Sequence, residues 1–192
     1  MKRIVTVLSC ITLVILLCSC GTKTVEWNGK TECMAQMFMV ADVTNPYEYV
    51  GMVDYVFVGT VTDTERLVLP DRKKEHKDNY STYKIHVDEN IKGELVEDIV
   101  CSKLGGYKKD GTMLLIAAEA PEGRIIMDNG LPEIGKQYIF MAYGQHDGSL
   151  ILSEIFDNRE YNQDILEEYR GYVENEIPYD RERFPSDYQK AK

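Results

Sequence analysis

The chain has 192 residues, of which 44% are hydrophobic, and its 32 acidic and 22 basic side chains give a formal net charge of -10. This much apolar material supports the core of one ordinary domain with tails and excludes a wholly disordered chain. The acidic balance argues against a nucleic-acid-binding protein, because neutralising phosphates needs clustered Lys and Arg. It also argues against adsorption onto an anionic membrane by charge alone.

The first segment of the chain has the pattern of an export signal. Lys2 and Arg3 precede an apolar run at residues 4–17, which is interrupted only by small side chains. About 20 apolar residues are needed to cross a bilayer as a helix. This shorter run, with its basic start, therefore predicts a signal peptide rather than a transmembrane anchor.

The apolar run ends in a motif that resembles the bacterial lipobox, which has the order Leu, small residue, Ala, Gly or Ser, then Cys. Here the motif reads Leu17-Cys18-Ser19-Cys20. The resemblance implies that residues 1–19 are a lipoprotein signal peptide and that Cys20 receives a diacylglyceryl group. Two acyl chains anchor a protein stably where one chain does not. We therefore expect lipid on Cys20 to hold the chain on the extracytoplasmic face of a bacterial membrane. The alternative is an ordinary secretory signal that contains cysteines.

Cleavage before Cys20 leaves three of the five cysteines. If Cys20 carries the lipid, Cys33 and Cys101 remain as a candidate disulfide, since exported proteins commonly form such bridges. The alternative is two unpaired buried thiols.

The predicted elements begin after a tether at residues 20–44, which is polar and turn-prone except for an apolar stretch of ambiguous period at 34–40. Asn45 and Pro46 have the residue types that open a helical turn, because Asn is a good N-cap and Pro suits the first helical position. Residues 53–62 are rich in β-branched and aromatic side chains, which predicts a strand. In this strand one face carries Tyr55, Phe57 and Val61.

The remaining strands follow with turn signals between them. Residues 67–79 form a charged loop, and residues 80–88 alternate strictly, with Tyr83, Ile85 and Val87 facing inward. Residues 113–118 are continuously apolar, which predicts a strand buried on both sides. The other predicted strands are at 95–102, 124–127, 137–143 and 149–155.

The hydrophobic period changes to that of a helix after residue 158. One stripe is formed by Tyr161, Ile165, Leu166, Tyr169 and Val173. This spacing predicts an amphipathic C-terminal helix within residues 158–177. Residues 178–192 form a charged tail, which we expect to be frayed.

Five to seven short strands predict a mainly β fold, a small antiparallel OB-like barrel at residues 45–157 with the helix packed on it. Three phrases there resemble netrin-like and metalloproteinase-inhibitor-like modules, which are five-stranded OB barrels. They are V-D-Y-V-F-V-G-T-V at 53–61, I-K-G at 91–93 and G-K-Q-Y-I-F at 135–140. In the inhibitor family a free N-terminal cysteine chelates the zinc of the target protease. Here Cys20 would carry lipid, so that mechanism and its residues do not carry over.

No catalytic or metal-binding motif is present in the sequence. The three histidines, His76, His86 and His146, lack zinc-ligand spacing, and there is no nucleophile elbow, P-loop or dinucleotide fingerprint. We therefore predict no catalytic residue, no metal and no cofactor, and a non-enzymatic binding or interaction module. The alternatives are an envelope-modifying hydrolase with a dispersed catalytic site, or a structural accessory lipoprotein.

Thirteen tyrosines stand out in the composition. OB barrels use aromatic faces to stack bases or sugars, and the acidic charge disfavours bases. A protein, a peptide or a glycan is therefore the expected partner, in addition to the membrane. The candidate ligand face comprises Tyr55, Tyr83, Tyr107, Tyr138 and Tyr143, and packing within the core is the alternative explanation for these side chains.

Overall fold

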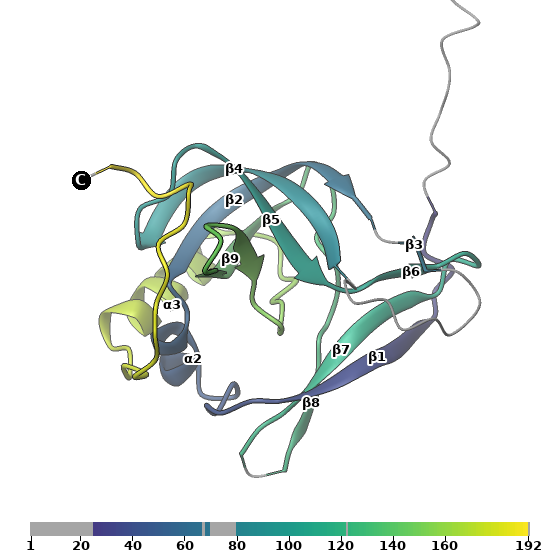
Figure 1. Ribbon diagram of the computed structural model, residues 1–192, viewed down its shortest axis with the longest axis horizontal. Coiled ribbons are helices and arrows are strands. Elements are labelled where there is room, and N and C mark those ends of the chain that lie inside the picture. Colours follow the sequence, from purple (N-terminus) through teal and green to yellow (C-terminus); the bar gives the residue numbers. More distant parts are fainter. Residues whose placement is uncertain (1–24, 67, 70–79, 122, 192) are drawn as a thin grey trace, which may run out of the picture.

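The computed structural model describes residues 25–66, 68–69, 80–121 and 123–191 and shows a mainly β fold with a closed barrel (Figure 1). Five strands make the barrel: β2 (Tyr55–Glu65), β4 (Tyr80–Lys92), β5 (Asp98–Leu104), β9 (Gln137–Gly144) and β10 (Leu150–Leu152). Their order around the barrel is β10-β5-β4-β2-β9. The predicted small β-barrel is confirmed, and its form is consistent with an OB-like fold.

Alternate residues of these strands fill the barrel interior. On β2 the inward side chains are Tyr55, Phe57 and Val61, and on β4 they include Tyr83 and Ile85. All five are nearly inaccessible to solvent. The side-chain faces predicted from the alternation of these two strands are therefore confirmed, because a two-residue period puts every second side chain on the same side.

The barrel is mixed rather than wholly antiparallel. Strand β10 pairs antiparallel with β9 and parallel with β5, whereas every other neighbouring pair is antiparallel. The reason is geometric: strand directions cannot alternate all the way around a closed ring of five members. One parallel pair must remain, and here it is the β5–β10 pair.

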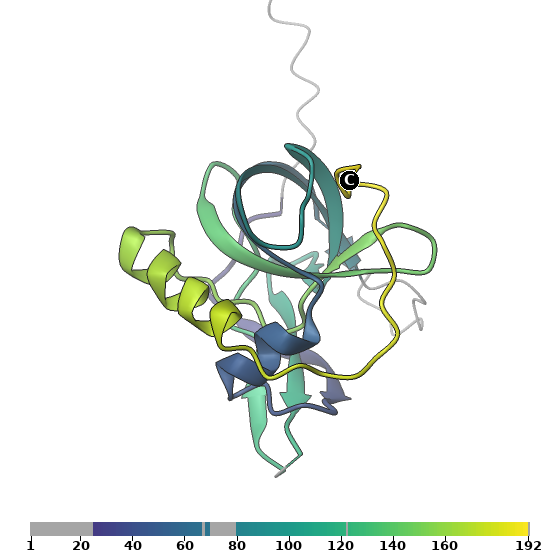
Figure 2. The same cartoon turned by 90° about the vertical axis from the view of Figure 1, so that its left-hand side faces the viewer.

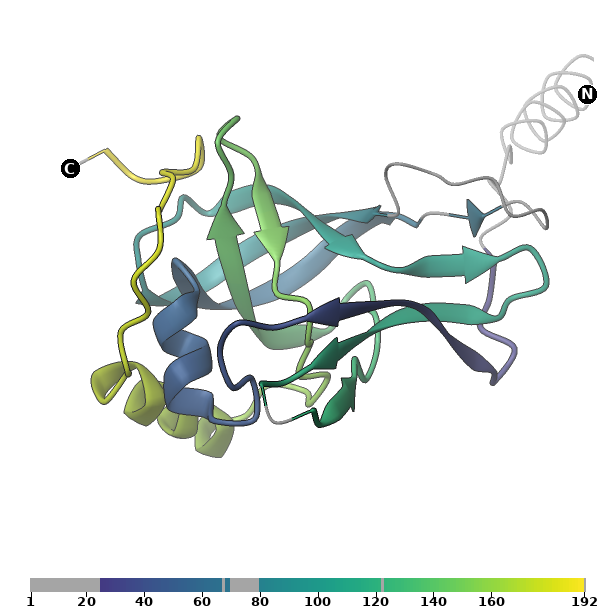
Figure 3. The ribbon, with the colours of Figure 1, turned by 60° about the horizontal axis from the view of Figure 1, so that its bottom comes forward.

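A second sheet lies beside the barrel and was not predicted. Its strands are β1 (Thr31–Phe38), β3 (Val68–Leu69), β6 (Gly106–Lys108), β7 (Met113–Glu119) and β8 (Ile125–Met127). The order is β1-β7-β6-β3, with β8 paired to β7, and Figure 3 shows β1 and β7 side by side, apart from the barrel strands. The segment from β6 to β8 thus leaves the barrel within the range 45–157. Strand β7 is buried along most of its length, as predicted.

Strand β1 corrects the expectation of a tether at residues 20–44. It pairs parallel with β7 from Thr31 opposite Met113 to Phe38 opposite Glu119. Most of its side chains are exposed, so its sequence lacks the clear apolar alternation by which β2 and β4 were found. Its partner lies far along the chain, and a parallel pair leaves no turn signal between the two strands.

Two helices pack on the outside of the barrel. The helix α2 (Pro46–Met52) begins at the N-cap Asn45, and α3 (Gln163–Glu174) begins at Asn162, whose side chain accepts a hydrogen bond from the backbone of Ile165. Buried residues of both helices pack in one cluster against the outward side chains of β2 and β9, which confirms the C-terminal amphipathic helix. Within the described residues no helix is both long and apolar enough to cross a membrane.

The C-terminal segment is docked instead of frayed, which corrects the expectation for residues 178–192. Figure 2 shows the described part running from the end of α3 to the barrel. Arg181 and Arg183 both form ion pairs with the buried carboxylate of Asp54. A Cβ atom at Gly144 would lie 2.0 Å from the carbonyl oxygen of Phe184, so only glycine lets the segment approach β9 this closely. The many charged residues of this segment did not reveal the docking in the sequence, because the acid that binds the two arginines, Asp54, lies far away along the chain.

A buried ion pair joins the barrel to the second sheet. Lys103 follows Ile99 and Cys101 on the buried face of β5, and its Nζ lies 2.5 Å from Oδ2 of Asp128, which follows β8. Both side chains are fully buried. Burial lowers the pKa of the Lys103 ammonium and raises the pKa of Asp128, while the mutual attraction of the two charges opposes both changes. The Lys103 Nζ also donates to the carbonyl oxygen of Glu154, 3.2 Å away.

The substitution Lys103→Met is expected to lower the free energy of unfolding by about 3–5 kcal/mol, because it leaves the Asp128 carboxylate buried without its cation. Equilibrium unfolding in urea measures the change. The double variant Lys103→Met/Asp128→Leu should recover much of the loss, since it removes both charges.

The matched control is Lys84→Met, which breaks an ion pair with Asp63 in which both side chains are more than half exposed. Surface pairs of this kind contribute little to stability. A loss for Lys103→Met no larger than that for Lys84→Met would contradict the structural role assigned to the buried pair.

Candidate functional site

Within the described residues, a groove of about 620 Å³ lies on the outer face of the barrel. One wall consists of the end of β1 and the residues that follow it (37–40), and the opposite wall is the docked C-terminal segment (179–181 and 184). The floor is formed by the ends of β5, β9 and β10 with residue 154. None of the side chains that line the groove is a histidine, cysteine, serine or threonine.

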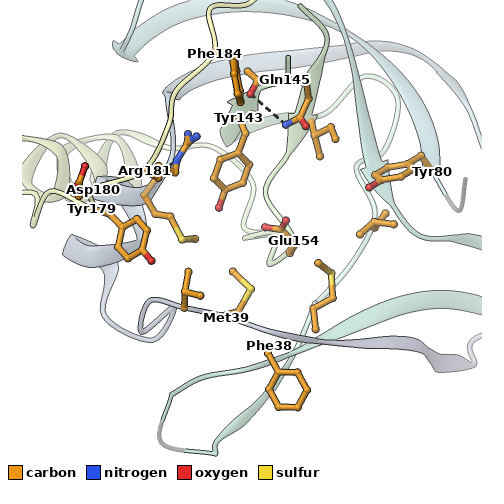
Figure 4. Close-up of a pocket in the computed structure, with 16 residues that line it drawn as sticks. Phe38, Met39, Tyr80, Tyr143, Gln145, Glu154, Tyr179, Asp180, Arg181 and Phe184 are labelled. Atoms are coloured by element: carbon orange, nitrogen blue, oxygen red, sulfur yellow. Dashed lines mark hydrogen bonds between the residues drawn. The ribbon is translucent and has the colours of Figure 1, made fainter. Parts of the chain in front are cut away.

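Methionines and aromatic side chains form half of the groove lining. Met37 and Met39 alternate along the chain at the end of β1 and lie on its inner side, while Met52 comes from α2 and Phe184 from the C-terminal segment. Phe38, which is 80% exposed, points away from the other labelled side chains (Figure 4). Thioether side chains are flexible and polarizable, so such a wall adapts to ligands of different shapes.

Two polar side chains meet in the groove without a well-formed hydrogen bond. The Oε2 atom of Glu154 and the hydroxyl of Tyr143 are both buried and interact with each other, but within the described residues neither has a partner at ordinary hydrogen-bond geometry. Figure 4 shows both side chains in the middle of the lining. Burial raises the pKa of Glu154, and the proximity of the Tyr143 hydroxyl and the Lys103 ammonium opposes this change. Buried polar atoms are normally hydrogen-bonded, so an unpaired carboxylate at a cavity wall calls for a functional explanation.

The neighbouring cations are already paired. Arg181 Nη2 lies 2.5 Å from Oδ2 of Asp54, and its guanidinium carbon is 5.2 Å from the centre of the Tyr143 ring. Lys103 forms its ion pair with Asp128. The carboxylate of Glu154 therefore has no ion-pair partner of its own in the described structure.

No protein-family model matches this chain, and no curated protein matches it significantly. The function of the groove must therefore be inferred from the residues that line it.

The five tyrosines of the predicted ligand face do not assemble into one surface. Tyr55, Tyr83 and Tyr138 are buried inside the barrel, and Tyr107, on β6, is buried in a separate small cluster with Leu115 and Leu131. Only Tyr143 lines the groove. The inward positions of a narrow barrel need large apolar side chains, and tyrosine fills them, so core packing explains most of these residues.

The residues that sequence reasoning missed are Met37, Met39 and Glu154. The two methionines carried a weak signal, since Met-x-Met spacing places both side chains on one face of a strand. Glu154 lies near the end of the strand predicted at 149–155 and resembles any other surface acid in the sequence. Its burial follows from the packing of segments that are distant along the chain.

The candidate disulfide is absent, because Cys33 and Cys101 are both free. Cys33 is exposed on the edge strand β1, and its Sγ lies 3.4 Å from the carbonyl oxygen of Ala35. Cys101 points into the barrel, where burial raises the pKa of its thiol. The two side chains belong to different sheets and face different environments. Cys20 lies outside the described residues.

The described histidines lie outside the groove. His86 Nδ1 is 3.0 Å from Oδ1 of Asp98 on an exposed strand face, and the His146 ring packs edge-on against Phe184 with ring centres 5.5 Å apart. His76 lies outside the described residues. Within the described part of the chain, no group of three or more His, Cys, Asp or Glu side chains is arranged to hold a metal ion.

The substitution Glu154→Gln is expected to stabilise the protein by about 1 kcal/mol at pH 8, because it removes a buried carboxylate that lacks a partner. A carboxyl whose pKa is raised in the folded state binds its proton more tightly there than in the unfolded chain. The wild type should therefore lose stability relative to the variant as the pH rises from the usual 4.5 of a glutamate to the raised folded value.

Urea unfolding of both proteins between pH 4 and pH 9 measures this difference. The control is Glu182→Gln, which makes the same charge change at an exposed position of the C-terminal segment and should show no such pH dependence. Parallel pH profiles for the wild type and Glu154→Gln would show that Glu154 is not an unpaired buried acid.

Proposed function

We propose that this chain is a lipid-anchored protein of the extracytoplasmic face of a bacterial membrane and that its folded part is a non-enzymatic binding module. The ligand occupies the groove. The lipobox-like sequence that ends in Cys20 supports the location, and the groove supports the binding role.

The size and lining of the groove carry the binding role. Its volume of about 620 Å³ lies within the range of ligand sites, which are typically about 300–1,000 Å³, largely apolar and equipped with a few polar groups. The methionines and aromatic rings provide apolar contact, and Glu154 with Tyr143 provides a polar point of orientation. Among the described residues that line the groove there is no imidazole, thiol or aliphatic hydroxyl, so these residues lack the usual nucleophile and base pairs of a hydrolase.

The anchor leaves the groove accessible. Strand β1 begins at Thr31, so the chain from Cys20 to that point spans at most about 40 Å even when fully extended. The groove is at the other end of β1, and a strand of 8 residues covers roughly 25 Å. The domain is thus held close to the membrane with the groove displaced from the attachment point.

Labelling with palmitate tests the anchor. Bacteria that express the full chain and grow with radiolabelled palmitate should label the wild type and the Cys18→Ala control, because only the last cysteine of the motif receives lipid in proteins with this signal. Cys20→Ala should lose the label and leave the membrane fraction. Retention of label by Cys20→Ala would exclude lipidation at this residue.

Photo-crosslinking in the same cells tests the binding role. With p-benzoylphenylalanine in place of Phe184, which lines the groove, a discrete crosslinked product is expected. With the same group in place of Ile134, which is 55% exposed and outside the groove, no such product is expected. Absence of a product at Phe184, or identical products at both positions, would contradict a ligand seated in the groove.

A further inference from the structure

One carboxylate of the groove, that of Glu154, has no ion pair of its own within the described residues. Glu154 is close to one ammonium, that of Lys103, but Lys103 is bound to Asp128 at 2.5 Å and offers the Glu154 residue a hydrogen bond only at its backbone carbonyl. The guanidinium of Arg181 shares the Asp54 carboxylate with Arg183. Asp180, at the rim of the groove, adds a further negative side chain. Glu154 is therefore a carboxylate of the described groove to which no cation is bound.

The unpaired atoms also define which kind of cation fits. Glu154 Oε2 is a hydrogen-bond acceptor with no well-formed donor beyond its interaction with the Tyr143 hydroxyl, which can itself accept or donate. A primary ammonium carries three N–H donors and satisfies both atoms. A quaternary ammonium carries the charge but has no N–H donor, so it leaves Glu154 Oε2 unsatisfied. A carboxylate or phosphate ligand is repelled by Glu154 and Asp180.

The side chains of the groove walls indicate which chemical group should carry the ammonium. Thioether and aromatic side chains, with Met39, Met52 and Phe184 among them, surround the polar point and offer apolar contact along its approaches. An aliphatic stem buries its methylene groups against such a surface. Arg181 already covers one face of the Tyr143 ring. The ammonium therefore meets the hydroxyl end of Tyr143 and not the centre of its ring.

We propose that the groove binds a primary ammonium group at the end of an aliphatic chain, with N–H groups donated to the Glu154 carboxylate and the Tyr143 hydroxyl and with the stem against Met39 and Met52. This inference rests on the proposed binding role of the groove. The chemistry is shared by free alkylamines and by the lysine side chains of peptides.

The experiment uses the protein labelled with ¹³C at the methionine methyl groups, because Met37, Met39 and Met52 line the groove and report binding there. NMR titration compares four probes: hexylammonium, hexyltrimethylammonium, hexanol and hexanoate. Hexylammonium should shift these methyl signals and bind at least about tenfold more tightly than the other three, which is the range for hydrogen bonds to a charged group. A fifth probe, the amide of Nα-acetyl-lysine, carries the same ammonium on a peptide unit.

Two variants connect the selectivity to the site. Glu154→Gln should weaken hexylammonium binding by about 10- to 100-fold and leave hexanol binding unchanged, and Tyr143→Phe should weaken it by a few fold. The control Glu182→Gln changes the same charge at an exposed position of the C-terminal segment and should bind like the wild type. Loss of binding in Glu154→Gln does not report unfolding, because this variant is expected to be the more stable protein.

The outcomes separate this inference from the proposed function. Hexanol or hexyltrimethylammonium binding as tightly as hexylammonium, or unchanged hexylammonium binding by Glu154→Gln, overturns the ammonium site, while crosslinking at Phe184 continues to test the binding role independently. If selectivity is found, tighter binding of the acetyl-lysine amide identifies a peptide side chain as the source. Tighter binding of hexylammonium identifies a free amine.

Discussion

The buried ion pair between Lys103 and Asp128 is the contact on which the arrangement of the two sheets depends. Lys103 lies at the end of the inward face of β5, and Asp128 follows the last strand of the segment that leaves the barrel. The other carboxylate oxygen of Asp128 accepts a hydrogen bond from the backbone of Phe156, 3.2 Å away, so the segment after β10 is held by the same residue. Apolar packing is tolerant of small shifts, whereas a buried ammonium and carboxylate are strongly unfavourable when separated. The pair therefore fixes where the second sheet meets the barrel, and so fixes one wall of the groove.

The same pair explains why Glu154 remains unsatisfied. The single ammonium of Lys103 can neutralise the charge of only one neighbouring carboxylate, and its short contact is with Asp128. Lys103 also holds the backbone carbonyl of Glu154, which keeps the residue in place while its side chain stays unpaired. A carboxylate in this position lowers stability, and proteins retain such costs at sites that act on other molecules. Glu154 lies at the wall of a cavity and not within a sealed core, so a ligand can reach its carboxylate. The loss of stability caused by this unpaired carboxylate is therefore attributed to ligand binding.

The sequence was sufficient for those parts of the fold that depend on local patterns. Alternation in β2 and β4, the N-cap residue Asn45 and the apolar stripe of α3 each act within a few neighbouring residues, and the structure has them as expected. Strand β1 and the docked C-terminal segment depend on distant partners, β7 and Asp54, which leave no local trace. The groove could not be predicted for the same reason, since three such distant segments form it. The tyrosines were misleading, because in a narrow barrel an aromatic side chain serves the core as readily as a ligand face.

The acidic composition of the whole chain and the unpaired carboxylate of Glu154 act at different distances. A net charge of -10 creates a long-range field that draws cations toward the surface, but salt screens this field within about 8–10 Å and it does not distinguish one cation from another. The Oε2 atom of Glu154 is buried at the groove wall, so its interaction with a cation is screened less and depends on the geometry of the donor. The exposed acids thus increase the rate of encounter with any cation. The buried carboxylate, the Tyr143 hydroxyl and the apolar walls then select a cation with N–H donors and an aliphatic stem, so the selectivity of the groove depends on its interior and not on the charge of the whole chain.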